Sequence, residues 1–382
     1  MYFRDIIGQE AAKRLLLETA QRGIVPHAQL FVGRDGSGAL GLAYAYARYL
    51  NCQEPSATDA CGHCPSCRRY DGYAEQELLY LFPIVNEAGR NYCSDYLEPW
   101  RQYLARGPYG RYEEWLEQLG ATGKRASIFA REGDELQQHL SYRVGGKGYR
   151  VLIVWCPERM QEALGNKLLK FVEEPAARTV ILMVTMQEEL VLGTLRSRMQ
   201  RLQLQPLSEG ELIGALMALP SVPAGSDALL AAHLADGSWR RARELFLGED
   251  TSDRELFGYL QRILRATVNA QPLEMRALGD ELAQLSRDEQ TQLIEYLARM
   301  FREFYLYNLQ QPELNYLTSR EQGIAQYLRR VVTGQNVRVV QEELDLAQRH
   351  LAQNVNARMV FFDLLLRLTS ALAASYRQHG IR

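Results

Sequence analysis

The sequence carries almost no excess charge and no long apolar run. Its 44 Lys and Arg residues nearly balance 46 Asp and Glu residues, which gives a formal net charge of −2. General electrostatic binding of nucleic acid needs a clear positive excess, so we expect any DNA contact to be local or delivered by partners. No run approaches the roughly 18 apolar residues of a membrane span, and the opening MYFRD lacks the apolar core of a signal peptide. We therefore expect a cytoplasmic protein without a membrane segment.

Cysteine is also scarce outside one short segment, which holds four of the six cysteines. Cys52, Cys61, Cys64 and Cys67 have the spacing C-x8-C-x2-C-x2-C, which is typical of a metal site and not of a disulfide framework. Four thiolates about 2.3 Å from one ion complete a tetrahedral shell, so the pattern predicts structural zinc. An iron–sulfur cluster and a redox pair stay open as alternatives. His63 could replace one thiolate, although with four cysteines present a solvent-facing turn residue fits it better.

The length and the hydrophobic pattern indicate more than one domain. A chain of 382 residues suggests two or three domains, and a hydrophobic content of 47% is enough to build their cores. Residues 149–155 and 179–185 have the pattern of buried parallel strands, and residues 162–174 between them have helical spacing. This alternation predicts an α/β domain with a parallel sheet through about residue 205. After Pro206 the strand patterns stop, and amphipathic helical patterns follow.

A glycine-rich segment follows a further apolar run, LFV. Its sequence, GRDGSGAL, has the frame of the phosphate-binding loop G-x-x-x-x-G-K-[ST] between a strand pattern and a helical pattern. Ala39 stands where that loop has a lysine to offset phosphate charge, and Leu40 where it has a hydroxyl to hold magnesium. The glycines Gly33, Gly36 and Gly38 supply backbone N–H groups only. The segment predicts an ATPase-type loop that does not bind ATP, and a glycine-rich turn unrelated to any ATPase is the alternative.

The stretch between residues 83 and 127 is rich in aromatic side chains. They could form a recognition surface, but such a density is more typical of an inserted helical hairpin that packs against its host. The residues are Tyr92, Tyr96, Trp100, Tyr103, Tyr109, Tyr112 and Trp115.

Five further segments carry the motifs of one family. DIIGQE at residues 5–10 is similar to its N-terminal motif, and HAQLFVG at 27–33 to its lead into the phosphate loop. NKLLKFVEEP at 166–175 matches N-x-L-L-K-x-x-E-E-P and is the most specific similarity. TLRSRM at 194–199 is similar to T-I-x-S-R-C, and DGS at 236–238 to part of a lid. Together these segments resemble the bacterial clamp-loader AAA+ subunits of DNA polymerase III, most closely the delta prime type.

The resemblance implies an AAA+ chain of three domains. Residues 1–206 would form an α/β domain with a parallel sheet of the P-loop type. This domain would include a zinc module at about 51–70, where the family has its own, and the aromatic-rich insertion at about 83–127. Residues 207–250 would form a small helical lid, and residues 251–382 an all-α collar domain that mediates oligomerisation.

The resemblance also implies a nucleotide site in which two motifs, the phosphate loop and the Walker B strand, have both lost their functional residues. Counting back from Asn166, the magnesium-binding Asp and the catalytic Glu of a Walker B strand correspond to Cys156 and Pro157. Neither side chain can position magnesium or activate water. Together with Ala39 and Leu40, these replacements imply a chain that binds no ATP and is not an enzyme on its own.

An arginine of the matched TLRSRM segment carries the implied mechanism. Arg198, next to Ser197, would reach ATP held by a neighbouring subunit and stabilise the transition-state charge in trans. The guanidinium stays charged and can bind phosphate through two N–H groups. The alternative is a solvated basic face made of Arg196, Arg198 and Arg201.

The function implied is that of a non-catalytic subunit of a hetero-pentameric clamp loader. Its partners would be ATPase subunits of the gamma/tau type and a delta-type subunit, with the sliding clamp and primed DNA reached through the complex. One alternative is an active AAA+ ATPase of the gamma/tau type, in which Lys147 or Lys167 would have to supply the missing charge. Another is a zinc-containing DNA-binding module without a motor partner.

Overall fold

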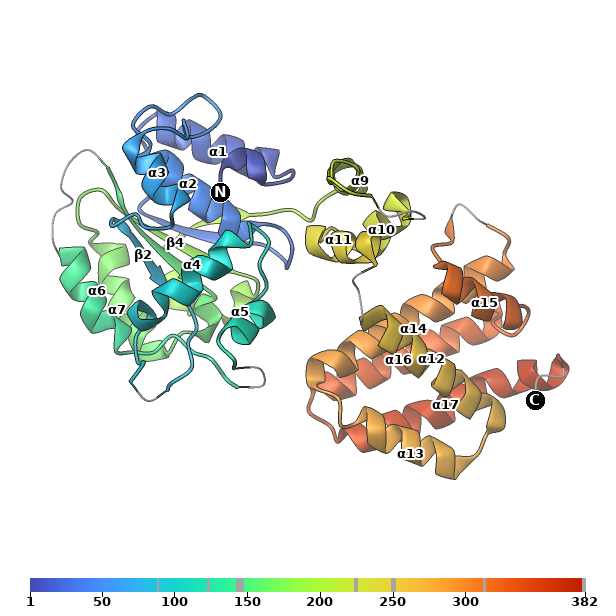
Figure 1. Cartoon of the computed structure of the whole chain (residues 1–382). Coiled ribbons are helices and arrows are strands. Elements are labelled where there is room, and N and C mark those ends of the chain that lie inside the picture. Colours follow the sequence, from blue (N-terminus) through green and yellow to red (C-terminus); the bar gives the residue numbers. More distant parts are fainter. Residues whose placement is uncertain are drawn as a thin grey trace. The chain divides into compact units, whose positions relative to one another are not determined.

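The chain forms two compact units, Met1–Phe246 and Leu247–Arg382 (Figure 1). The boundary between the units falls near the expected end of the lid at residue 250, and the finer division at residue 206 stays a prediction. The computed structural model describes residues 1–87, 89–121, 124–141, 148–222, 226–248, 252–311 and 314–379.

A five-stranded parallel sheet forms the centre of the first unit, which confirms the predicted α/β class. Neighbouring strands follow the order β2-β3-β4-β1-β5, and every pairing is parallel. Val32 pairs with Thr185 and Trp155 with Val184, so the carboxyl ends of β1, β3 and β4 lie side by side. The strands are β1 (Ala28–Val32), β2 (Leu78–Leu81), β3 (Arg150–Trp155), β4 (Thr179–Thr185) and β5 (Gln200–Gln203).

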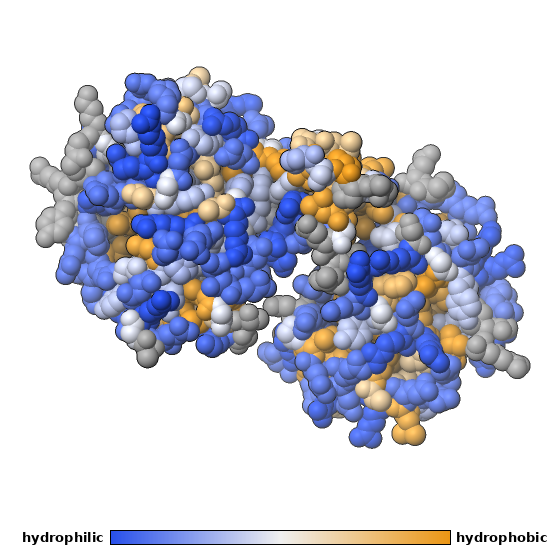
Figure 2. All heavy atoms as spheres, in the orientation of Figure 1, coloured by the Kyte–Doolittle hydropathy of each residue, from blue (hydrophilic) through white to orange (hydrophobic). Residues whose placement is uncertain are grey.

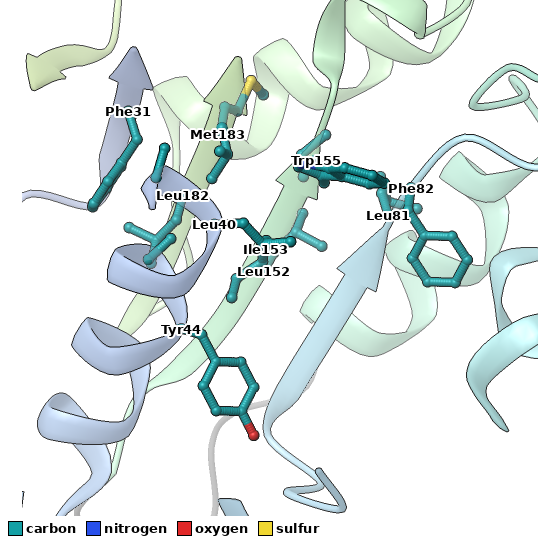
Figure 3. Close-up of a cluster of buried hydrophobic side chains, with 14 of the residues drawn as sticks. Phe31, Leu40, Tyr44, Leu81, Phe82, Leu152, Ile153, Trp155, Leu182 and Met183 are labelled. Atoms are coloured by element: carbon teal, nitrogen blue, oxygen red, sulfur yellow. The ribbon is translucent and has the colours of Figure 1, made fainter. Parts of the chain in front are cut away.

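Helices cover both faces of this sheet. In Figure 1, α2 with α1 and α3 lies on one face, and α6 with α7 lies on the other. The face of α2 toward the sheet buries Leu40 and Tyr44 among Leu152, Ile153 and Leu182 of β3 and β4 (Figure 3). The α-helices are α1 (Glu10–Gln21), α2 (Ala39–Asn51), α3 (Pro65–Asp71), α4 (Leu97–Ala105), α5 (Tyr112–Gln118), α6 (Glu132–Ser141), α7 (Glu162–Glu173) and α8 (Gly193–Arg196). Short 3-10 turns are η1 (Phe3–Asp5), η2 (Cys93–Tyr96), η3 (Pro157–Arg159) and η4 (Glu188–Leu190).

After β5, only helices follow in the described residues. The first unit ends with α9 (Glu209–Met217), α10 (Ala228–Leu234) and α11 (Trp239–Leu247). Ser208 begins α9 with a side chain that accepts the N–H of Glu211, while the Glu211 carboxylate accepts the N–H of Ser208. This reciprocal cap explains why the helix starts at Glu209.

The aromatic insertion is a packed element of the first unit. Trp100 and Trp115 are fully buried, and their rings lie 5.2 Å apart, centroid to centroid. Trp100 also lies 5.2 Å from Trp155 of β3, and it stacks on Phe82 at 4.2 Å. The interpretation as a hairpin packed against its host is therefore correct for these residues, while Tyr109 is only half-buried.

The second unit has its own all-helical core. Its helices are α12 (Ser252–Asn269), α13 (Pro272–Leu282), α14 (Arg287–Asn308), α15 (Ser319–Tyr327), α16 (Gly334–Ala352) and α17 (Ala357–Gln378). Buried leucines, phenylalanines and valines from all six helices or their flanks, among them Leu297, Phe301 and Leu368, form one cluster.

One described helix, α17, is long and apolar enough to span a membrane, with a mean hydropathy of 1.4 over its best 18-residue window. The sequence-based expectation missed it because Arg and Asp interrupt its apolar residues. Length and composition alone are weak indicators, and α17 packs against α12, α13 and α16. It has the pattern of a core helix, with the buried side chains Val360, Phe361, Leu364, Leu365, Leu368, Leu372 and Tyr376.

The visible face of both units is mostly hydrophilic with scattered apolar patches (Figure 2).

Candidate functional site

The predicted phosphate-type loop connects β1 to α2 at the carboxyl edge of the sheet. Gly36 and Gly38 have φ of 75° and 80°, a left-handed conformation that disfavours other residues. Gly38 precedes the first residue of α2 and provides no side-chain cap. The Gly33 N–H donates to the Thr185 carbonyl at 3.1 Å, which fixes the start of the loop to β4. The strand, loop and helix therefore follow one another as the motif predicts.

Other parts of the chain cover this loop. A Cβ added to Gly38 would lie 2.9 Å from Tyr109 Cε1, and one added to Gly41 would lie 2.3 Å from Pro108 Cβ. Both partners belong to the turn between α4 and α5 of the aromatic insertion. Tyr109 is held there because its hydroxyl accepts the N–H of Ile7 at 2.6 Å.

The segment before α11 covers the loop as well. A Cβ on Gly36 would lie 2.1 Å from Ser238 Oγ and 3.0 Å from Ser238 Cα. The Trp239 N–H donates to the Gly36 carbonyl at 3.4 Å, and the Trp239 ring lies 6.2 Å from that of Tyr109. At Gly36, Gly38 and Gly41 the chain therefore packs so closely against the loop that no larger residue fits without a shift of its neighbours.

The charges around the loop do not replace the missing lysine. Ala39 is buried and apolar. Arg34 pairs with Asp236 at 3.6 Å, and Asp35 lies 3.5 Å from Arg111 Nε. Burial raises the pKa of the Asp35 carboxyl, an effect that Arg111 opposes. The loop thus carries one paired cation and one carboxylate, which is a poor setting for a polyphosphate.

The positions expected for the Walker B pair lie at the end of β3. Cys156 is buried, has φ of 56°, and donates its N–H to the Val184 carbonyl at 2.9 Å. Burial raises the pKa of its thiol, so it stays neutral. Pro157 is buried and begins η3. Neither residue offers an oxygen ligand for magnesium.

Glu158 follows this pair, and the sequence did not identify it as a site residue. Glu158 accepts a hydrogen bond of 2.7 Å from Thr185 Oγ1 at the end of β4, and burial raises the pKa of its carboxyl. It lines an open groove of about 600 Å³ together with Arg125, Arg159 and Leu190. Its only sequence signal was its place three residues after the end of a buried strand.

Arg198 lies on the surface, two residues after α8. Its side chain is 44% exposed, and its Nε donates to Glu173 Oε1 at 2.7 Å. Its Nη1 donates to the Thr194 carbonyl at 3.0 Å. Arg196 donates to the Glu188 carbonyl at 3.2 Å.

Arg201 forms an ion pair with the Glu188 carboxylate at 2.8 Å. The stretch from residue 196 to 201 is thus a basic face whose members each have a bond to the protein. Ser197 is exposed on the same stretch, and its hydroxyl donates to the Thr194 carbonyl at 3.2 Å.

The four clustered cysteines come together at the end of α2 and the start of α3. Their sulfur atoms all lie within 4.8 Å of one another. Cys61 Sγ lies 3.9 Å and Cys52 Sγ 3.7 Å from Cys67 Sγ. A regular tetrahedron with metal–sulfur bonds of about 2.3 Å requires sulfur atoms about 3.8 Å apart. The four thiols, with Cys64 as the N-cap of α3, therefore have the spacing of a closed four-sulfur metal site.

Backbone N–H groups support this geometry. Those of Cys61, Cys64 and Cys67 donate to the sulfurs of Cys52, Cys61 and Cys64 at 3.2, 3.4 and 3.4 Å. His63 is no candidate ligand, because its side chain is 68% exposed and its Nε2 lies 3.1 Å from a Glu54 oxygen. Its place in a solvent-facing turn agrees with the expectation.

Comparisons with known proteins identify the family. The sequence model of the family described as DNA polymerase III, delta subunit, matches residues 8–208, more than half of the 382 residues. The Escherichia coli (strain K12) DNA polymerase III subunit delta' is 31% identical over 243 residues, which are 63% of this chain and 60% of that protein. The Pseudomonas aeruginosa subunit delta' is 28% identical over 251 residues, 65% of this chain and 64% of that protein.

A gamma/tau subunit of DNA polymerase III from Mycobacterium bovis is 29% identical over 196 residues, 51% of this chain and 27% of that protein. The chain thus spans less than two thirds of the length of each of these relatives. The delta' matches extend further along the chain than the gamma/tau match, and the family model covers the whole sheet and the loop at its edge. On these grounds the chain belongs to the delta prime family of bacterial DNA polymerase III clamp-loader subunits.

Proposed function

We propose that this chain is a non-catalytic clamp-loader subunit that binds no ATP itself. The observation that carries the proposal is the covered loop, in which Pro108, Tyr109 and Ser238 occupy the space next to Gly41, Gly38 and Gly36. Two losses add to this cover, the lysine position taken by Ala39 and the magnesium position taken by Leu40. We therefore expect a loop without its lysine and its hydroxyl, and packed against these three residues, to bind no triphosphate.

The direct test is equilibrium binding of a fluorescent ATP analogue with magnesium to the purified chain. We expect no binding at millimolar nucleotide in protein that is folded by circular dichroism. Binding at micromolar nucleotide would contradict the proposal and favour the active ATPase.

Arg198 gives this subunit its part in the chemistry. We expect it to approach the γ-phosphate of ATP on a neighbouring gamma/tau-type subunit, where an arginine finger is worth about 10³–10⁵ in rate. Its exposure and its position two residues after the short helix α8 support such a role. In a reconstituted complex, Arg198→Ala should lower ATP turnover at the neighbouring site by about 10³-fold or more, while Arg201→Ala, which removes a neighbouring arginine of the same face, should leave turnover unchanged. Equal turnover in both variants would refute the finger.

The active ATPase is the second candidate, and it lacks a cation. Lys167 lies on α7 with its Nζ 2.6 Å from Asp134, so its charge is already paired away from the loop. Lys147 lies outside the described residues. A DNA-binding module without motor partners is the third candidate, and a steeply salt-dependent affinity of the isolated chain for DNA would support it.

Structural zinc is the metal that the cysteine cluster fits. Cys52, Cys61, Cys64 and Cys67 would close the tetrahedral shell, leaving no position for water, and the ion would fix the end of α2 to α3. Metal analysis of freshly purified protein should find about one zinc per chain, whereas iron would contradict this assignment.

The remaining parts of the chain would serve assembly. Helices α9 to α11 would act as the lid and α12 to α17 as the collar of a hetero-pentamer in the cytoplasm. The sliding clamp and primed DNA would be reached through this complex. Analytical ultracentrifugation with gamma/tau-type and delta-type subunits tests the assembly directly.

A further inference from the structure

Arg198 is held at two points of the first unit. Its Nε donates to Glu173 Oε1 at 2.7 Å, and its Nη1 donates to the Thr194 carbonyl at 3.0 Å. A guanidinium has five N–H donors, and these two bonds leave three for a further acceptor. Fixing one side of the group in this way aims the free donors in one direction.

Glu173 occupies an unusual place for a carboxylate. It is the last residue of α7, where the unpaired carbonyls of the helix give the end a partial negative charge. A carboxylate at this end costs stability, and Glu174 follows directly. Helix stability therefore does not account for the residue, and the contact that distinguishes it is the one with Arg198.

The pair is also exposed in the free chain. The side chains of Arg198 and Glu173 are 44% and 49% exposed. A surface ion pair of this kind contributes typically 0.2–1 kcal/mol to stability. Its contribution to folding is therefore small, and the geometry of the guanidinium is what it changes most.

We propose that Glu173 is a positioning residue for Arg198, which orients the guanidinium so that its free N–H groups face the phosphates of the neighbouring subunit's ATP. The inference rests on the proposed function of Arg198 in trans. When a neighbouring subunit covers the pair, water leaves and the ion pair strengthens, so the orientation is tightest in the assembled complex. A displacement of about 1 Å can cost about 10²-fold in rate, which makes such orientation valuable.

The test is ATP turnover of the complex reconstituted with gamma/tau-type ATPase subunits. Glu173→Ala should lower kcat about tenfold and leave KM for ATP within about twofold, because the neighbour still binds the nucleotide. Glu173→Asp, which keeps the carboxylate, should recover part of the rate. Glu188→Ala is the matched control, since it breaks the 2.8 Å ion pair with Arg201 on the same face and should leave kcat unchanged.

A double-mutant cycle separates this inference from the function on which it rests. Glu173→Ala should have no further effect when Arg198 is already alanine, because the residue acts only through that guanidinium. An undiminished kcat for Glu173→Ala, or the same loss in both backgrounds, overturns the positioning role. If Arg198→Ala itself leaves turnover unchanged, the proposed role of Arg198 in trans is wrong. That test needs no Glu173 variant, so the two proposals can be refuted separately.

Discussion

Restoring the two missing residues of the phosphate loop should not restore ATP binding. In the variant Ala39→Lys with Leu40→Thr, the lysine and the hydroxyl of the motif return to their positions. Pro108 and Tyr109 still lie where a Cβ on Gly41 or Gly38 would meet them at 2.3 and 2.9 Å. The cover therefore remains, and we expect no nucleotide binding at millimolar concentration.

The same variant should be less stable by an amount that follows from burial. Leu40 is 7% exposed and packs among Leu152, Ile153 and Leu182 (Figure 3). Shortening a buried leucine costs about 2–5 kcal/mol, and a buried hydroxyl without a partner adds about 1–3 kcal/mol. Ala39 is 8% exposed, so a lysine there must desolvate its ammonium or push the cover aside.

Tryptophan fluorescence measures this loss in the relevant unit alone. All four tryptophans, at positions 100, 115, 155 and 239, lie within Met1–Phe246, so unfolding of the second unit is silent. Denaturant titration should show a lower midpoint at an unchanged slope. Circular dichroism at zero denaturant confirms that the variant is folded before nucleotide is added.

A second variant distinguishes two causes of lost nucleotide binding, the side chains packed against the loop and the missing lysine and hydroxyl. Adding Pro108→Gly, Tyr109→Gly and Ser238→Gly to the restored loop removes the three side chains that lie next to its glycines, and measurable nucleotide binding should then appear. Micromolar binding by the restored loop without these changes would refute the reasoning, because the missing lysine and hydroxyl would then be the whole cause. Absence of binding in both variants would also contradict it, because these three side chains would then not be what blocks the loop.

Three further predictions concern stability and metal. Gly41→Ala should lower the stability of the first unit by about 1–3 kcal/mol by Trp fluorescence, since its Cβ would lie 2.8 Å from the Pro108 Cα. The control Gly214→Ala, with nothing within 4 Å, should instead raise stability by up to about 1 kcal/mol. Burial raises the pKa of Glu132 to about 7 from the usual 4.5, so the folded state favours its protonated form and stability should fall as the pH rises from about 4.5 to 7. Glu132→Gln should flatten that slope in unfolding titrations, and an unchanged slope would exclude this residue as its source. Cys67→Ser should abolish stoichiometric metal binding in metal analysis, and full zinc content in this variant would contradict a four-sulfur site.

The strands that could be predicted from the sequence are those with both faces buried. Strands β1, β3 and β4 are buried on both faces, so each contains an uninterrupted apolar run of three to five residues, LFV, VLIVW and VILMV. Strand β5, QRLQ, buries only Leu202 of its four residues and was not predicted. Strand β2 has four residues, LLYL, too few to distinguish a strand from a turn of helix. Both are edge strands, which their pairing with β1 or β3 holds in the sheet.

Local chemistry was predictable for a similar reason. The cysteine cluster spans residues 52–67, and spacing within so short a segment limits where the thiols can lie. The boundary of the first helix was not predictable in this way, because α1 begins at Glu10 directly after Gln9, which adopts φ of 60°. A left-handed glutamine leaves no trace in hydrophobic periodicity. Contacts such as Thr185 with Glu158 depend on which strands are neighbours, and sequence spacing does not contain that information.

The covered loop shows why a glycine frame alone does not establish nucleotide binding. Phosphate loops keep glycines so that backbone N–H groups can approach the ligand. In this chain Gly36, Gly38 and Gly41 have another physical reason to be glycine, because a Cβ at each would collide with Ser238, Tyr109 or Pro108. These partners lie between 67 and 202 residues away in sequence. The same glycines thus suit a loop that binds phosphate and a loop that packs against its own chain, so the residues at positions 39 and 40 and the tertiary contacts are needed to distinguish the two.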